Sequence, residues 1–225
     1  MAGIDGDEAR VGAAIRGAEG TGGVDVRLGG LAFIVNRLAG LGLVAYLYLH
    51  LVILSMLVRG PDAWDDFVDI ALSPPFLALD VVLLAGMLIH ALNGIRVVLV
   101  GLGLVVRRQS ALLIATPPLV GQMVSGGALL VLLTLHLVAQ HFVVPTGLRY
   151  SEDVIAALRS PAMVALEVAL LVFVTYHALV GVRVIVFDVG FSTRTERRIT
   201  IILRIVGIVT IVYGVALLTA ILNAA

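Results

Sequence analysis

The chain contains no cysteine, so it can supply neither disulfide bonds nor thiolate ligands for a metal ion or an iron–sulfur cluster. Charge is also scarce, because only 13% of the 225 residues are charged and the formal net charge is zero. This balance gives no reason to expect nucleic acid or an acidic protein as a partner. In place of charge the sequence has a hydrophobic composition of 60%, which excludes an ordinary soluble domain and indicates an all-α, polytopic membrane bundle.

Five apolar runs are long enough to cross a lipid bilayer. They cover residues 33–58, 76–106, 118–144, 162–189 and 199–223. Residues 1–29 ahead of them are polar and Gly-rich and lack the continuous apolar core of a secretory signal, so we expect a retained tail rather than a cleaved peptide. The sequence thus predicts a cytoplasmic tail over 1–29, followed by one five-helix transmembrane domain over 30–225.

Arginine placement predicts the orientation of these five spans. With the N-terminus in the cytoplasm, three arginines fall on the outer side, namely Arg59, Arg149 and Arg159. The other twelve fall on or near the cytoplasmic side: Arg10, Arg16, Arg27, Arg37, Arg96, Arg107, Arg108, Arg183, Arg194, Arg197, Arg198 and Arg204. Because arginine accumulates in cytoplasmic loops, we expect a multi-pass protein of the cell membrane with its N-terminus inside and its C-terminus outside.

Two similar heptapeptides indicate an internal duplication. HALNGIR at 90–96 and HALVGVR at 177–183 each place an imidazole and, six residues later, a guanidinium inside an apolar run. Polar groups at membrane depth are costly and are usually functional. Upstream, LYLHLV at 47–52 corresponds to LTLHLV at 133–138 at nearly the same offset. The pattern therefore predicts two related halves, each with two membrane histidines.

The depths of these four histidines predict which of them meet. His50 and His136 each lie nine residues before the end of a helix that runs outward, which places them roughly 13 Å from the outer face. His90 and His177 lie fifteen or sixteen residues after the prolines that begin two inward-running helices, roughly 23 Å from that face. The sequence therefore predicts one pair at each of two levels.

Two histidine pairs from four helices suit two bis-histidine b haems stacked across the membrane. One iron can bind only ligands at one depth, so the predicted pairs are His50 with His136 for one haem and His90 with His177 for the other. A lone histidine in a membrane helix is more often a packed, hydrogen-bonded residue than a ligand. Four histidines at matched depths in a duplicated pattern favour ligation of haem iron instead.

Glycines near the deeper pair fit a flat macrocycle. Gly86 and Gly94 flank His90 on one helical face, and Gly181 lies one turn after His177. A missing side chain at these positions would let a haem lie against the backbone. The alternative is that these glycines serve close helix packing, as glycines in membrane helices often do.

Five other polar side chains carry competing interpretations. Arg96 and Arg183, a turn and a half nearer the cytoplasm than the deeper histidines, are candidates to bind haem propionates or to act as snorkelling anchors. His141 lies off the face of the outer histidine on its helix, so we expect an interfacial residue. Asp80 and Glu167 lie near the outer starts of two inward helices, where a carboxylate favours a helix N-terminus; proton handling is the alternative.

Three segments resemble the membrane-anchor cytochrome b of succinate dehydrogenase and fumarate reductase. NRLAG at 36–40 opens the first run, HALNGIR has the pattern His-x3-Gly-x-Arg, and HALVGVRVIVFDVG at 177–190 adds Asp188 eleven residues after its histidine. The first copy has Gly101 at the corresponding position. The resemblance covers about residues 33–223, and one chain with five spans and four histidines is similar to the single-subunit, two-haem branch of the family.

The resemblance implies the cofactors and their residues. In that branch the first and third histidines hold the distal haem and the second and fourth hold the proximal haem, which agrees with the pairs derived from depth. It also implies a quinone, usually menaquinone, with Arg37 and Asp188 near its pocket. The tyrosine that often follows the aspartate is Val189 here, so a quinone site near the outer haem is an alternative.

The resemblance further implies a place in respiratory complex II. A flavoprotein subunit would oxidise succinate, and an iron–sulfur subunit docked on the cytoplasmic face would pass electrons to this anchor, which binds no succinate itself. Arg107, Arg108 and the 194–198 segment could receive that partner, although positive-inside topology also explains them. A trimer of the whole complex is a further expectation.

Two other functions compete with this interpretation. Another quinone-linked dehydrogenase, such as a formate dehydrogenase, hydrogenase or nitrate reductase, could use a di-haem cytochrome b, but the duplication and the motif with Asp188 argue against it. A transporter could use histidines for metal or proton transfer. It should carry more carboxylates at mid-depth than this chain has.

Overall fold

A computed structural model describes residues 5–101, 117–143 and 149–224. The chain divides into two compact units, Met1–Leu38 and Ala39–Ala225. Within the described ranges every regular element is a helix. Five helices are long and apolar enough to cross a membrane, namely Gly30–Arg59, Pro74–Leu99, Val120–Phe142, Pro161–Phe187 and Thr193–Ala224. The predicted all-α, five-span membrane fold is confirmed.

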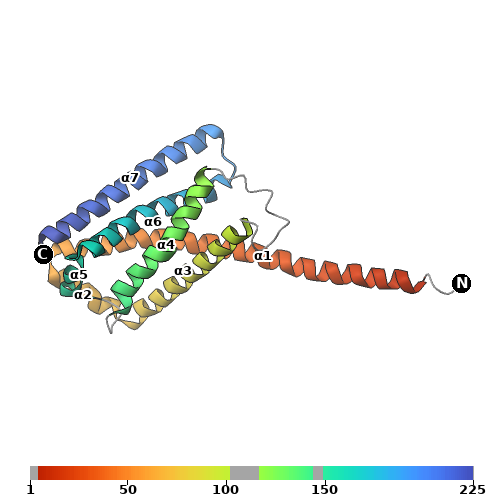
Figure 1. The fold of residues 1–225 in the computed structure, drawn as a ribbon, viewed down its shortest axis with the longest axis horizontal. Coiled ribbons are helices and arrows are strands. Elements are labelled where there is room, and N and C mark those ends of the chain that lie inside the picture. The colour runs from red at the N-terminus through yellow and green to blue at the C-terminus, as the bar shows by residue number, and fades with distance from the viewer. Residues whose placement is uncertain (1–4, 102–116, 144–148, 225) are drawn as a thin grey trace. The chain divides into compact units, whose positions relative to one another are not determined.

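The helices follow one another in the order drawn in Figure 1. They are α1 (Asp5–Leu54), the 3₁₀ helix η1 (Ser55–Arg59), α2 (Pro61–Ala71), α3 (Pro74–Gly101), α4 (Pro117–Leu137), the π-helix η3 (Val138–Phe142), α5 (Ser151–Leu158), α6 (Pro161–Phe187) and α7 (Thr193–Ala224). Four of them begin at a proline, whose fixed φ and missing N–H suit the first helical position. Prolines therefore mark four of these nine helix starts in the described ranges.

The first unit contains the N-terminal part of α1. The helix runs from Asp5 without a break into the first span at Gly30, so the predicted polar tail is helical where the structure describes it. Near the end of this unit the Arg37 guanidinium lies 4.0 Å from the centroid of the Phe33 ring. This cation–π contact holds the arginine along its own helix.

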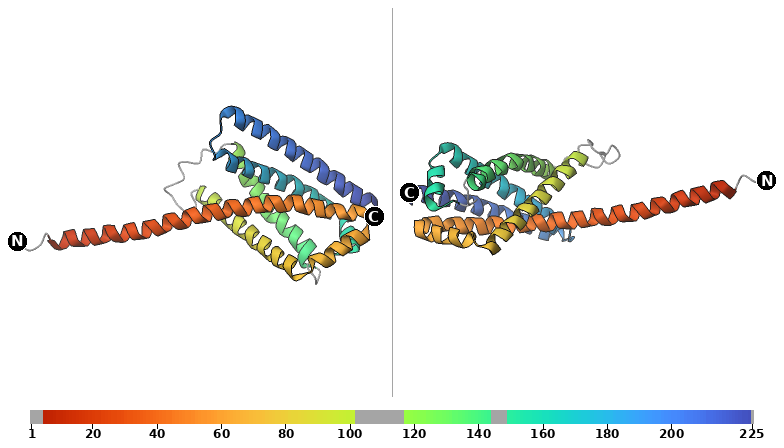
Figure 2. Two further views of the ribbon diagram at one scale, coloured as in Figure 1. Left: turned by 180° about the vertical axis from the view of Figure 1, so that it is seen from behind. Right: turned by 90° about the horizontal axis from the view of Figure 1, so that it is seen from below.

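Within the second unit, α6 and α7 lie side by side along their lengths (Figure 2). Glycines permit the close approach: a Cβ at Gly207 would lie 2.9 Å from Leu179, and a Cβ at Gly214 would lie 2.5 Å from Leu171. The buried residues of α7 recur every three or four positions, which makes one continuous packing stripe. They are Gly207, Thr210, Gly214, Leu217 and Ile221.

Two short helices, α2 and α5, close one end of the bundle, and we call this pair the cap. The acidic segment after Arg59 is helical, because Pro61 starts a helix in which Trp64, Val68 and Ala71 form the buried face. This i, i+4, i+7 spacing is that of an amphipathic helix. The hydrophobic core gathers here rather than around the histidines, and comprises Leu57, Trp64, Val68, Val154, Leu158, Leu217 and Ile221.

Hydrogen bonds join the two helices of the cap. Trp64 Nε1 donates a hydrogen bond to the backbone carbonyl of Arg149 at 2.8 Å. Asp65 accepts from the Ser151 backbone N–H at 2.8 Å and from the Ser151 hydroxyl at 3.1 Å, which caps the N-terminus of α5 from α2. The Tyr150 hydroxyl donates to Asp69 at 2.9 Å, and this hydrogen bond to a carboxylate raises the pKa of Tyr150. The cap is thus held by polar as well as apolar contacts.

Candidate functional site

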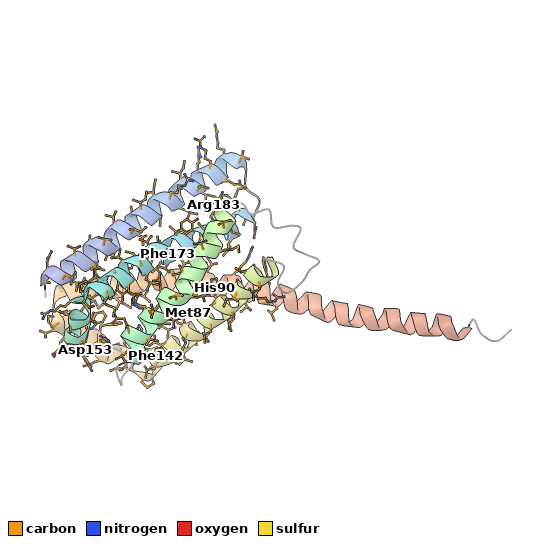
Figure 3. The ribbon with its side chains drawn as sticks, viewed as in Figure 1. Met87, His90, Phe142, Asp153, Phe173 and Arg183 are labelled. Carbon is orange, nitrogen blue, oxygen red and sulfur yellow. The ribbon has the colours of Figure 1, made fainter. Side chains whose placement is uncertain are left out.

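Two histidine pairs lie inside the second unit. The rings of His50 on α1 and His136 on α4 have centroids 6.3 Å apart and planes at 86°. The rings of His90 on α3 and His177 on α6 are likewise 6.3 Å apart, at 87°; His90 is labelled in Figure 3. We call the pair nearer the cap, His50 and His136, the outer pair and the other the inner pair. The structure thus places close together the same histidines that were predicted, from their depths in the membrane, to form pairs.

The spacing within each pair fits two imidazoles on opposite sides of one metal atom. Two metal–nitrogen bonds of about 2.1 Å each, with the half-width of each ring added, separate the centroids by about 6 Å. In the described part of the chain, no group of three or more His, Asp or Glu side chains could hold a metal ion by itself. The arrangement therefore suits a metal whose other ligands come from a cofactor, as in haem.

Hydrogen bonds at His177 define the protonation of its ring. Its Nδ1 lies 3.1 Å from the Ser125 hydroxyl, which itself donates to the Gln122 carbonyl. Its Nε2 lies 3.2 Å from the Gln122 amide nitrogen, which can only donate. The proton is therefore on Nδ1 and the lone pair is on Nε2, which is the form that binds a metal through Nε2. A metal there would take the place of the Gln122 amide.

A carboxylate holds His136 in the outer pair. Its Nδ1 lies 2.9 and 3.0 Å from the two carboxylate oxygens of Glu167, and Gln140 donates to the same carboxylate at 3.1 Å. Glu167 and Asp80 were interpreted as helix N-terminal residues, and this was wrong because neither α3 nor α6 has an acidic residue in its first turn. Glu167 lies deeper in α6 and faces a candidate ligand instead.

His141 also differs from its expected position. An α-helix would place it off the face of His136, but the two ring centroids are 5.9 Å apart. The chain from Val138 to Phe142 is a π-helix, in which residues five apart approach one another along the helix. The π-helix therefore adds a third imidazole, that of His141, and the Gln140 side chain to the surroundings of the outer pair.

Glycines contact the inner histidines from the neighbouring helices. A Cβ at Gly40 of α1 would lie 3.0 Å from Cε1 of His90, and a Cβ at Gly126 of α4 would lie 3.2 Å from Cε1 of His177. Sequence reasoning missed both glycines. The signal was present, because Gly40 and Gly126 are separated by 86 residues, as are His50 and His136.

The glycines predicted to make room for a macrocycle have different surroundings. A Cβ at Gly86 or Gly94 would meet nothing within 4 Å, and one at Gly181 would lie 3.6 Å from the Gln122 side chain. Open space beside Gly86 and Gly94 on α3 is compatible with a flat ring against that helix. These glycines are not needed to pack α3 against the described side chains.

Arg183, a candidate for binding propionates, turns toward α7. Its Nε donates to the Thr200 hydroxyl at 3.2 Å, and its guanidinium lies 4.5 Å from the centroid of the Phe187 ring. Arg183 is labelled in Figure 3. It lines a cavity of about 380 Å³ together with Phe187, Thr193, Glu196, Arg197, Thr200, Ile201 and Arg204. The cavity gathers three guanidinium groups where α6 ends and α7 begins.

The other predicted site residues belong to different elements of the chain. Arg96 is exposed on α3, and Asp188 is exposed directly after α6, where its backbone N–H bonds the Val184 carbonyl at 3.2 Å. Arg37 belongs to the first unit. Arg107 and Arg108, which are candidates to receive a partner subunit or to follow from positive-inside topology alone, lie outside the described residues.

The sequence also matches known proteins. The family described as succinate dehydrogenase/fumarate reductase transmembrane subunit matches residues 21–116 and, separately, 119–217. The chain belongs to this family. It is a multi-pass membrane anchor subunit of a succinate dehydrogenase or fumarate reductase. This assignment argues against the two competing functions, a transporter and a subunit of another quinone-linked dehydrogenase.

Two curated members of the family are similar to about half of the chain. The succinate dehydrogenase hydrophobic membrane anchor subunit of Thermoplasma acidophilum is 34% identical over 96 residues, which are 43% of this chain and 78% of the relative. That of Archaeoglobus fulgidus is 30% identical over 100 residues, 44% of this chain and 85% of the relative. Each is a shorter protein that aligns with only part of this anchor.

The two stretches matched by the family divide the four paired histidines evenly. The stretch 21–116 contains His50 and His90, and the stretch 119–217 contains His136 and His177. Each histidine pair therefore takes one member from each stretch. Neither stretch contains both residues of a pair, so each candidate site is assembled between the two parts of this membrane anchor.

Proposed function

We propose that this membrane anchor binds two b haems, one between the histidines of the outer pair and one between those of the inner pair. The observation that carries the proposal is the equal separation of 6.3 Å in both pairs, with ring planes near perpendicular. When bound, two such haems supply one-electron transfer between an iron–sulfur subunit and a quinone. The proposed quinone is menaquinone, in line with the resemblance to the two-haem branch.

The chain's own residues support this assignment in two ways. The hydrogen bonds of Nδ1 to Glu167 in His136 and to Ser125 in His177 fit the tautomer that binds a metal through Nε2. Gly40 and Gly126 leave room for the inner rings to stand against neighbouring helices. These features orient ligands before a cofactor arrives, which is the contribution expected of a protein that tunes a haem.

The proposal extends to the partners and the orientation. The chain is expected to span the cell membrane with its N-terminus in the cytoplasm, where a flavoprotein and an iron–sulfur subunit would dock. Three guanidinium groups at the junction of α6 and α7, those of Arg183, Arg197 and Arg204, give that end the positive charge typical of a cytoplasmic face. The quinone site is proposed near Arg37 and Asp188 on this side, with the region of the outer pair as the alternative.

A reduced-minus-oxidised optical spectrum of the purified complex, with haem quantified per anchor chain, tests the proposal. We expect two b haems per chain. Removal of one inner ligand in a His90→Ala or His177→Ala variant should leave one haem per chain, because the outer pair shares no ligand with the inner pair.

Two results would contradict this reading. An assembled, unmodified complex without haem would show that the histidine pairs serve packing alone. Loss of both haems from an assembled His90→Ala complex, while His50→Ala loses only one, would show that the pairs do not act as separate sites.

A further inference from the structure

Glu167 is a carboxylate that contacts His136 of the outer pair through a hydrogen bond. Both of its oxygens lie within 3.0 Å of His136 Nδ1. Its side chain is 21% exposed and that of His136 is 12% exposed, so the contact is largely shielded from the surroundings. An interaction of this kind is stronger than the same contact in water.

The chemistry of the two groups sets the direction of the hydrogen bond. A histidine that binds a metal through Nε2 carries its proton on Nδ1, so His136 must donate and Glu167 must accept. A carboxylate in this role fixes the ring orientation and increases the basicity of the ligand nitrogen. Gln140 Nε2 donates to Glu167 Oε1 at 3.1 Å and holds the carboxylate in place from the π-helix.

The inner pair is supported differently. Nδ1 of His177 meets the neutral hydroxyl of Ser125, which is only 2% exposed. A hydroxyl accepts a hydrogen bond but brings no net charge, whereas the carboxylate at the outer pair brings a negative charge next to a ligand. The two sites therefore differ in one hydrogen-bond partner. His136 of the outer pair faces a charged carboxylate, whereas His177 of the inner pair faces a neutral hydroxyl.

We propose that Glu167 is the positioning residue of the outer pair, which orients His136 and makes the outer haem harder to reduce than a neutral partner would. This inference rests on the proposed function, since it concerns a haem bound by His50 and His136. A negative charge beside an axial ligand stabilises the ferric state relative to the ferrous state, because the ferric centre carries one more positive charge. Glu167 would thereby give the two haems different reduction potentials, although the geometry of their histidine pairs is nearly identical.

The test is a redox titration of the whole complex, with the two haems followed by their optical bands. Glu167→Gln keeps a hydrogen-bond acceptor but removes the charge. The outer haem should remain bound, with the ratio of reduced to oxidised protein increased about tenfold at a given potential, an upward shift of about 59 mV for one electron. The inner haem should titrate as in the unmodified complex.

Two further variants separate charge from packing. Gln140→Leu removes the donor that shares the carboxylate, so Glu167 should accept more strongly from His136 and lower the potential of the outer haem. Asp80→Asn is the matched control, because Asp80 occupies the position on α3 that corresponds to Glu167 at an offset of 87. It should shift the potential of the outer haem less than Glu167→Gln does, because Asp80 interacts with His141, which is not a member of either pair.

The outcomes distinguish this inference from the proposed function. Absence of haem from the unmodified complex would overturn the proposed function itself. Two haems whose potentials do not respond to Glu167→Gln would overturn only the role of Glu167. Equal upward shifts in the Glu167→Gln and Gln140→Leu variants would also overturn it, because loosened packing moves both in one direction whereas charge moves them in opposite directions.

Discussion

Gly126 and Gly127 are neighbours on α4, but only Gly126 lies against a histidine. A Cβ at Gly126 would lie 3.2 Å from Cε1 and 3.6 Å from Nδ1 of His177, and one at Gly127 would meet nothing within 4 Å. The difference arises because successive residues of a helix point about 100° apart. A single added methyl group should therefore disturb the inner site at Gly126 and leave it unchanged at Gly127.

We expect Gly126→Ala to weaken the inner site. The added methyl group would press on the His177 ring and disturb its hydrogen bond with Ser125, and overpacking of this kind costs about 1–3 kcal/mol. Haem quantified per chain should fall from two toward one in purified Gly126→Ala complex, while Gly127→Ala should retain two. Equal haem contents in the two variants would show that the contact with His177 does not matter.

Some of the site follows from sequence and some does not. The levels of the four histidines could be predicted because the rise of a helix is fixed, so depth is a matter of counting residues. The hydrogen-bond partners of Nδ1 in His136 and His177 could not be predicted. Glu167 and Ser125 reach these histidines only because of how α4 and α6 are rotated about their axes. That rotation is set by packing between helices, which the hydrophobic runs leave open.

At the scale of elements, α7 depends on a stripe of small residues. Gly207, Thr210 and Gly214 lie on its buried face, and the Thr210 hydroxyl is 3.2 Å from the hydroxyl of Tyr48 on α1. Membrane helices gain little from burying apolar surface against one another, because lipid is equally apolar. Close packing through small residues is therefore what holds α7 against the bundle.

Gly214→Leu should loosen α7 from α6. A Cβ at Gly214 would already lie 2.5 Å from Leu171, so a branched side chain there forces the helices apart, at a cost of about 1–3 kcal/mol. The expected result is a lower midpoint of thermal unfolding in detergent. Gly42→Leu on α1 is the control, because a Cβ at Gly42 meets nothing within 4 Å; an equal loss there would argue against the packing explanation.

The π-helix shows where sequence reasoning about elements fails. The apolar run through His136 has no proline or glycine between Val138 and Phe142, so the α-helical period was assumed to continue. Arg149 donates from its guanidinium to the Ala139 carbonyl at 2.5 Å, which gives one carbonyl of the π-helix a partner outside it. The π-helix thus has a contact with a residue beyond it, which local periodicity does not reveal.

At the scale of the whole second unit, the cap links chain segments on either side of α3 and α4. Trp64 of the cap is the only tryptophan of the chain. Its side chain is 8% exposed and belongs to the hydrophobic core at this end of the bundle. Its fluorescence therefore reports on the cap alone. The five spans were predictable because long apolar runs are unambiguous, whereas α2 and α5 are short and contain charged residues.

Asp65→Ala should open the cap. The substitution removes both hydrogen bonds that Ser151 gives to Asp65, and loss of such a helix cap costs about 1 kcal/mol. We expect the emission of Trp64 to shift to longer wavelength at lower denaturant concentration than in the unmodified protein. Asp62→Ala, on the same helix, is the control; an identical shift in both variants would indicate a general effect of lost charge.

The division of each histidine pair between the stretches 21–116 and 119–217 has a consequence for assembly. A cofactor bound by both members of a pair would act as a crosslink between α1 and α4 at one level and between α3 and α6 at the other. Binding to the assembled bundle alone stabilises that state by mass action. Haem supply would then govern how much of the anchor survives in the membrane, and the protein's abundance would follow the cell's capacity to make haem.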